Sequence, residues 1–183
     1  MKSITSQIRS IIRAIEGPEI RQDLYDTPQR VQRAFEEIFN GYEVDIPGLF
    51  KVFEEDGKDE IVILRNIHFW STCEHHLLTW EGYASVAYLP QEKVVGASKL
   101  ARLVEAYAHR LQLQERVGRQ VAEAMMKYLN PRGVAVVIKG KHSCISCRGV
   151  RNETSELVTS VMLGAFRENA ASRYEVLKLI GDI

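Results

Sequence analysis

The chain has 183 residues, of which 45% are hydrophobic, so it is long enough to bury the core of one domain. Lys plus Arg and Asp plus Glu both number 24, so the formal net charge is zero and no overall field recruits nucleic acid or an anionic membrane. Any anion must therefore be bound by a local cluster of cations.

The N-terminal region predicts neither a signal peptide nor a membrane span, because charged residues interrupt its apolar residues every few positions. The chain has three cysteines, an odd number that makes a poor disulfide framework. In the cytoplasm thiols stay reduced and can serve as metal ligands. These features predict a cytoplasmic protein.

Two helices are predicted at the start of the chain. Isoleucines recur at helical spacing between positions 4 and 15 and stop before a Gly-Pro pair. A second helix is expected to begin at Thr27, as the N-cap, with Pro28 at the first helical position, and to end at Asn40. The chain therefore opens with a helical region.

The rest of the chain predicts two pairs of strands separated by two helices. β-branched and aromatic residues dominate four segments, and these predict strands at 61–70, 83–89, 134–139 and 156–162. Apolar residues on one helical face predict helices at 98–111 and 117–128, with a short closing helix at 173–180. This order indicates an α+β domain.

A candidate metal site lies at the ends of two predicted strands. Cys73 and His76 belong to a Cys-Glu-His-His motif, and Cys144 follows a later strand. Thiolate and imidazole are ligands that Zn²⁺ prefers, and a Cys₂His set leaves the fourth tetrahedral position free for water, as in catalytic zinc sites. The neighbouring His75 and His142 are then available as proton donors or acceptors.

Cys147 leaves an alternative open. In an extended strand residues 144 and 147 point to opposite faces, so one metal could bind both only if the segment turns. We therefore expect Cys144 to be the ligand and Cys147 to pack. If Cys147 also bound the metal, the site would be a closed Cys₃His zinc site with a structural role.

A candidate phosphate site is formed by Ser98, Lys99 and Arg102, because the start of a helix favours an anion. Lys and Arg are also common on exposed helix faces. Glu115 opens the next helix, where a carboxylate ordinarily compensates the dipole, but it can also accept two hydrogen bonds from guanine. Arg148, close to the expected metal, is a further candidate phosphate ligand.

Together these motifs resemble GTP cyclohydrolase I. The resemblance is carried by TPQRVQRAFEEIFNGY, STCEHHLL, VAYLP, VGASKLARLVEAYAHRLQLQERV, HSCISCRGV and TSVMLGAFRE, which extend from Thr27 to Glu168. It implies that GTP is the substrate. The implied reaction is zinc-dependent opening of the guanine imidazole ring, which releases formate and forms 7,8-dihydroneopterin triphosphate.

The resemblance also implies a role for each candidate residue. Cys73, His76 and Cys144 are implied as the zinc ligands. His75, His142 and Ser98 are implied as catalytic, with His142 protonating N7 of guanine and Ser98 helping the rearrangement of the ribose. The residues implied to bind substrate are Glu115 and Gln114 for guanine, Lys99, Arg102 and Arg148 for triphosphate and ribose, and Arg30 and Arg33 for the triphosphate from a neighbouring subunit.

The fold implied by the resemblance is a tunnelling fold. It is an α+β unit in which an antiparallel four-stranded sheet carries two helices on one face, preceded by N-terminal helices. Residues 1–45 are then the N-terminal helical region and residues 46–183 the catalytic tunnelling-fold domain, which act as a single functional unit. The implied assembly is a homodecamer with active sites at subunit interfaces.

Two rival functions remain to be weighed. A zinc nucleobase deaminase also uses one His, two Cys and a nearby Glu, but its H-x-E and P-C-x-x-C pattern is absent here. The other rival is an inactive relative that is stabilised by the closed Cys₃His site. The chain departs from the family pattern at Cys147, where a non-ligating residue is usual, and at Thr79-Trp80, where Pro-Phe is common.

Overall fold

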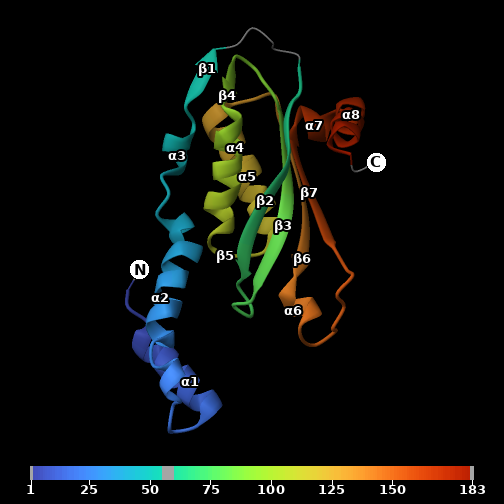
Figure 1. Cartoon of the computed structure of the whole chain (residues 1–183). Helices are drawn as coiled ribbons and strands as arrows, with labels where there is room; N and C mark the ends of the chain where they lie inside the picture. Colours follow the sequence, from blue (N-terminus) through green and yellow to red (C-terminus); the bar gives the residue numbers. More distant parts are fainter. Residues whose placement is uncertain (1, 55–59, 182–183) are drawn as a thin grey trace. The chain divides into compact units, whose positions relative to one another are not determined.

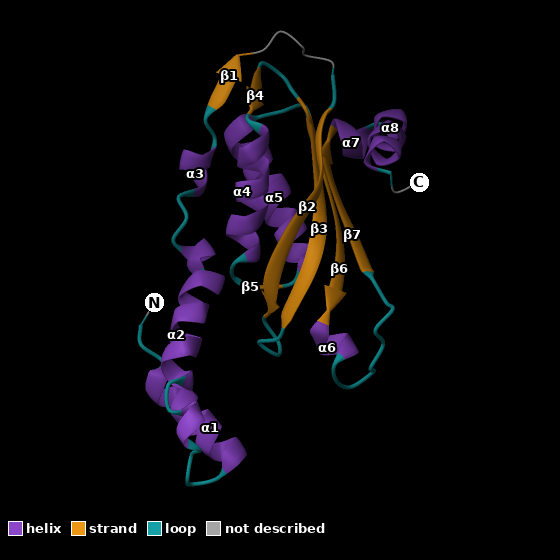
Figure 2. Cartoon of the chain, viewed as in Figure 1, coloured by secondary structure: helices purple, strands orange, loops and turns teal. Residues whose placement is uncertain are grey.

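The computed structural model describes residues 2–54 and 60–181. The contacts within the chain group into two units, Met1–Asn40 and Gly41–Ile183. Figure 1 labels the helices and strands, and Figure 2 distinguishes them by colour.

The first unit is helical, as predicted. α1 spans Thr5–Glu16 and α2 spans Thr27–Ile38, with the short 3₁₀ helix η1, Gln22–Leu24, between them. The main-chain nitrogen of Ile4 donates to Oε1 of Gln32 on α2 at 2.8 Å, so the start of α1 is fixed to α2.

The start of α2 differs from the prediction by one residue. Pro28 lies in the first turn, where its missing N–H leaves no helical hydrogen bond unmade. The cap position belongs to Asp26 rather than Thr27, and Asp26 makes no side-chain capping bond. The prediction of Thr27 as the N-cap was therefore wrong, because Thr27 is itself helical.

A five-stranded sheet forms the centre of the second unit, in the order β5-β2-β3-β6-β7. Four of its strands are antiparallel neighbours and confirm the predicted strands: β2 Val62–Cys73, β3 Thr79–Leu89, β6 Gly133–His142 and β7 Leu157–Gly164. β5, Leu111–Gln112, runs parallel to β2 and was not predicted, since two residues carry no periodic pattern. A second sheet pairs β1, Val52–Glu54, with β4, Lys93–Val95.

Two long helices cover one face of the large sheet, as predicted (Figure 1). They are α4, Ala97–Ala108, and α5, Gln114–Leu129. Alternate strand residues are buried against them, and burying each such side chain contributes roughly 1.5–3 kcal/mol. This core contains Val86, Tyr88, Val134, Val136 and Ile138 from the strands and Leu103, Val104, Val117, Val121 and Met125 from the helices.

Helices also cover one end of the opposite face. α7, Ala165–Glu168, and α8, Ala170–Ile180, lie on the other side of the sheet from α4 and α5 (Figure 2). They bury the strand residues that point away from the main core, and α8 contains the predicted closing helix. This second core includes Ala87, Ala135, Val137, Phe166 and Val176. The α+β prediction is confirmed, with this addition. No helix in the described ranges is sufficiently long and apolar to cross a bilayer.

The short segment before the second unit's first helix is fixed to the end of α4 through Gly41. This glycine lies in the 3₁₀ helix η2, Asn40–Tyr42, and α3, Ile46–Leu49, follows it. The Gly41 nitrogen donates to the His109 carbonyl at 3.2 Å, and Arg110 Nη2 donates to the Gly41 carbonyl at 2.8 Å. A Cβ at Gly41 would lie 2.7 Å from the His109 oxygen and would collide with the Ala106 carbonyl.

We predict that Gly41→Ala lowers the free energy of unfolding by about 1–3 kcal/mol, because main-chain carbonyls cannot move aside cheaply. Urea denaturation measures this loss. The matched control is Gly96→Ala, where a Cβ would meet nothing within 4 Å. Equal losses in the two variants would show that the close contact at Gly41 is unimportant.

Candidate active site

The Cys-Glu-His-His motif forms a tight turn at the end of β2. The Leu77 nitrogen donates to the Cys73 carbonyl at 2.9 Å, and the Cys73 nitrogen donates to the Leu78 carbonyl at 2.9 Å. Leu77 has a φ of 54°, a left-handed conformation that leucine rarely adopts. The turn brings two side chains together, so that Cys73 Sγ and His76 Nδ1 lie 3.7 Å apart.

The second cluster reaches this turn through the pairing of β3 with β6. Trp80, near the start of β3, is paired with His142 at the end of β6. The chain then turns into α6, Ser143–Ser146, which carries Cys144. The ligand atoms of Cys73, His76 and Cys144 all lie within 4.8 Å of one another. The structure thus brings the three predicted ligands into one group that could hold a metal ion.

α6 also bears on the alternative site that includes Cys147. The segment does turn, since the Cys147 nitrogen donates to the Ser143 carbonyl at 2.9 Å. Nevertheless Cys147 is exposed, and among the described residues it is not part of the group that could hold a metal. The geometry therefore gives no support to the closed Cys₃His site.

The side chain of His142 is positioned by the indole ring of Trp80 and by the side-chain amide of Gln114. Its imidazole stacks on the Trp80 indole, with ring centroids 4.6 Å apart and planes inclined by 13°. Its Nε2 lies 2.9 Å from Oε1 of Gln114. Burial lowers the pKa of His142, and the Glu115 carboxylate opposes this by favouring the charged ring. Burial thus favours the neutral imidazole, and the indole and the amide fix its orientation.

The side chain of Gln114 decides which nitrogen of His142 carries the proton. It is only 1% exposed, and its amide nitrogen donates to the carbonyls of Ile138 at 3.0 Å and Leu157 at 2.8 Å. Because carbonyls only accept, Gln114 must turn its oxygen toward His142, whose Nε2 therefore donates. The free acceptor of the neutral ring is then Nδ1. Gly140 makes room for this amide, since a Cβ there would collide with Oε1.

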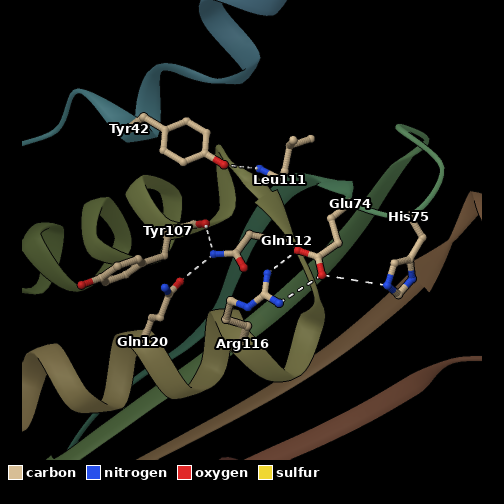
Figure 3. A network of polar contacts seen from close by, with 8 residues as sticks. All are labelled: Tyr42, Glu74, His75, Tyr107, Leu111, Gln112, Arg116 and Gln120. Atoms are coloured by element: carbon tan, nitrogen blue, oxygen red, sulfur yellow. Dashed lines mark hydrogen bonds and ion pairs between the residues drawn. The ribbon is translucent and has the colours of Figure 1, made fainter.

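His75 lies beside a carboxylate on the surface. Its side chain is 62% exposed, and its Nε2 is 3.9 Å from Oε1 of Glu74. Glu74 in turn accepts two hydrogen bonds from Arg116 on α5, one of them at 3.0 Å (Figure 3). The Arg116 guanidinium lowers the pKa of Glu74. Sequence reasoning missed this pair, although Glu74 and Arg116 each adjoin a residue that it had selected.

The residues predicted to bind substrate fall into separate places. Arg148 lies beside the metal group, because its Nη1 is 3.5 Å from His76 Nε2. Glu115 lies in the first turn of α5. Arg30 and Arg33 lie on α2, in the first unit, where Arg30 pairs with Asp26 at 3.9 Å.

The other three predicted residues lie on α4, with Ser98 and Lys99 in its first turn, at the far end from the metal group, and Arg102 near the middle of the helix. Ser71, two residues before Cys73, donates from Oγ to the carbonyl of Ala108, the last residue of α4, at 2.7 Å. Ser98 lies near the first residue of the same helix, about 15 Å away along its axis. Figure 1 shows these two ends of α4 beside β5 and β4. Within one chain, Ser98 and Lys99 are therefore not brought together with the metal group.

Comparison with known proteins decides the family. Residues 4–181 match GTP cyclohydrolase I. The chain belongs to the GTP cyclohydrolase I family. It is 44% identical over 182 residues to GTP cyclohydrolase 1 of Thermoanaerobacter pseudethanolicus, covering 99% of this chain and 97% of that one. It is 46% identical over 183 residues to GTP cyclohydrolase 1 of Methylococcus capsulatus, with the same coverage.

Among solved structures, the archaeosine synthase QueF-Like in the apo form is similar with a TM-score of 0.47 and 21% identity, over 57% of this chain and 93% of that one. Membership of the GTP cyclohydrolase I family confirms the resemblance drawn from the motifs. The arrangement described above, a sheet of mainly antiparallel strands with α4 and α5 on one face and helices earlier in the chain, agrees with the tunnelling fold that the resemblance implied.

The two thiols of this GTP cyclohydrolase I family member are suited to a cation. Burial raises the pKa of Cys144, and the adjacent Cys73 sulfur raises it further. Without a metal the Cys144 thiol therefore favours the protonated form. A metal binds the thiolate, so it must displace this proton. Metal affinity should consequently fall as the pH falls.

We predict that Cys144→Ala loses the bound metal and that Cys147→Ala retains it, because only the first removes a member of the Cys₂His group. Elemental analysis of the purified proteins after dialysis against a weak chelator measures this. Retention by Cys144→Ala together with loss by Cys147→Ala would contradict the assignment of the ligands.

Proposed function

We propose that the protein is a GTP cyclohydrolase I. It hydrolyses the imidazole ring of the guanine in GTP, releases formate and forms 7,8-dihydroneopterin triphosphate. Family membership over residues 4–181 supports this activity. The structural observation that carries it is the Cys₂His group with His142 fixed beside it. The donor set leaves one tetrahedral position open, as a hydrolytic metal site requires.

The metal in this proposal is Zn²⁺, because two thiolates and one imidazole are a donor set that zinc prefers. When bound, zinc supplies a water acidic enough to act as a nucleophile near neutral pH. Cys73, His76 and Cys144 hold the ion. Arg148, 3.5 Å from His76, places a positive charge at the edge of the group for a phosphate or the ribose.

His142 accepts a proton from solvent at Nδ1 and passes it to N7 of guanine, which makes C8 electrophilic and returns the ring to its neutral form. Its Nε2–H is held by Gln114, so both transfers take place at Nδ1. Glu115 accepts hydrogen bonds from N1–H and the amino group of guanine, and Gln114 assists recognition through its main chain. His75, exposed beside Glu74, serves the later proton transfers at the ribose, with Ser98.

The triphosphate is bound by cations from more than one copy of the chain. Lys99 lies in the first turn of α4, at the far end from the metal group, which supports a site that two copies share, and Arg102 follows it one turn later. Arg30 and Arg33, in the helical region 1–45, reach the site from a neighbouring subunit and complement the catalytic domain 46–183. The assembly is a homo-oligomer, a decamer by resemblance to the family, and three free cysteines favour the cytoplasm.

Incubation with GTP tests the activity directly. We expect the metal-loaded protein to release formate and to yield a fluorescent pterin after oxidation. Glu115→Gln should lower kcat/KM by at least about 100-fold, because the amide leaves a guanine donor unpaired. Glu123→Gln, an equivalent change further along α5, is the matched control and should match the wild type. Absence of formate from the wild-type protein would rule out the proposed reaction.

Complementation between variants tests the shared site. Lys99→Ala and Cys144→Ala should each be nearly inactive alone. When the two are coexpressed in one oligomer, about a quarter of the sites receive both intact halves, and activity should recover to that extent. As a control, Cys144→Ala and His142→Asn alter the same half and should not complement. No recovery in the first mixture would contradict sites formed by two copies.

A further inference from the structure

Glu74 and Arg116 join two motifs that the proposed mechanism uses separately. Glu74 stands between Cys73 and His75 in the metal-binding turn. Arg116 follows Glu115 in the first turns of α5. Both guanidinium nitrogens contact the carboxylate, with Arg116 Nη2 donating to Glu74 Oε1 at 3.0 Å and Nη1 donating to Oε2 (Figure 3). A two-point contact of this kind fixes orientation as well as distance.

The strand between these two motifs is itself firmly held. Gln112 on β5 donates from Nε2 to the Tyr107 carbonyl at 2.9 Å and to Oε1 of Gln120 at 2.6 Å. The Gln112 carbonyl accepts a hydrogen bond from the Glu74 nitrogen at 3.1 Å. The Leu111 nitrogen donates to the Tyr42 hydroxyl at 3.1 Å. The main chain of the turn is therefore anchored to β5, and the ion pair adds a side-chain link to α5.

The exposure of the Glu74–Arg116 ion pair indicates that it contributes to the geometry of the site more than to the free energy of unfolding. The Glu74 side chain is 26% exposed and that of Arg116 is 42% exposed, and ion pairs near the surface contribute little to global stability. The same Glu74 carboxylate lies 3.9 Å from His75 Nε2. It is therefore placed to orient His75 as well as to connect the turn with α5.

We infer that Glu74 and Arg116 are positioning residues. Their ion pair aligns the turn that carries Cys73, His75 and His76 with the start of α5, so that the metal group and Glu115 act on the same guanine. This role rests on the proposed function. Neither residue is a metal ligand or a proton carrier in the proposed mechanism, and a displacement of about 1 Å between the groups that they align can cost about 100-fold in rate.

The test compares Glu74→Gln and Arg116→Gln, singly and together, with Arg119→Gln on α5 as the matched control. Each single variant should lower kcat by about 10- to 100-fold with little change in KM for GTP, metal content or unfolding midpoint. The kcat of the double variant should be no lower than that of the less active single variant, because all three variants remove the same interaction. With Co²⁺ in place of Zn²⁺, the visible absorption spectrum should shift similarly in both single variants.

Several results would overturn the positioning role. The first is a kcat that stays unchanged in either single variant, or that falls equally in Arg119→Gln. The second is a double variant whose loss of activity equals the product of the two single losses. The third is a single variant that loses its metal or unfolds, or whose Co²⁺ spectrum is unchanged. Wild-type activity separates this failure from failure of the proposed function. If the wild type forms formate and the variants match it, only the positioning role is wrong; if the wild type forms none, the proposed reaction is wrong.

Discussion

The antiparallel pairing of β3 with β6 is the constraint on which the rest of the site depends. It sets Trp80 opposite His142 and Gly82 opposite Gly140. The turn that precedes β3 carries Cys73 and His76, and the turn that follows β6 carries Cys144, so this one register brings together ligands from distant parts of the sequence. A slip of one residue would move every side chain of β6 to the other face of the sheet and would separate the three donors.

The same register explains why small and polar residues are buried beside the site. Gly140 is required where Gln114 crosses β6, because a side chain would collide with the amide oxygen. The amide nitrogen of Gln114 reaches carbonyls of both β6 and β7, so the glutamine is satisfied while it faces His142. Trp80 adds a flat surface against the imidazole. This buried amide is tolerated because its polar atoms are satisfied, and the same hydrogen bonds fix the orientation of the His142 ring.

The sequence predicted the elements and ligands whose signal is local. Strand and helix periodicity located β2, β3, β6, β7, α4 and α5, and ligand chemistry selected Cys73, His76 and Cys144 before any geometry was known. Features that depend on tertiary contact were not predictable. β5 has two residues, the second core under α8 depends on which strand face is left open, and Glu74 and Arg116 are 42 residues apart. The direction of the Gln114 side chain follows from carbonyls on two other strands, which no spacing rule supplies.

Under the proposed function, α4 explains how a chain of zero net charge binds a triphosphate at the candidate metal site. The carbonyl at its last residue, Ala108, is fixed to Ser71 beside the metal-binding turn, while Lys99 and Arg102 lie in its first turns. The helix is rigid, so the cation in its first turn, Lys99, cannot fold back onto the metal group of its own chain. In the proposed oligomer, one α4 therefore supports the metal group of its own subunit at one end and presents cations to a neighbouring site at the other. Catalysis would then require assembly, and the isolated chain would bind the metal without completing the substrate site.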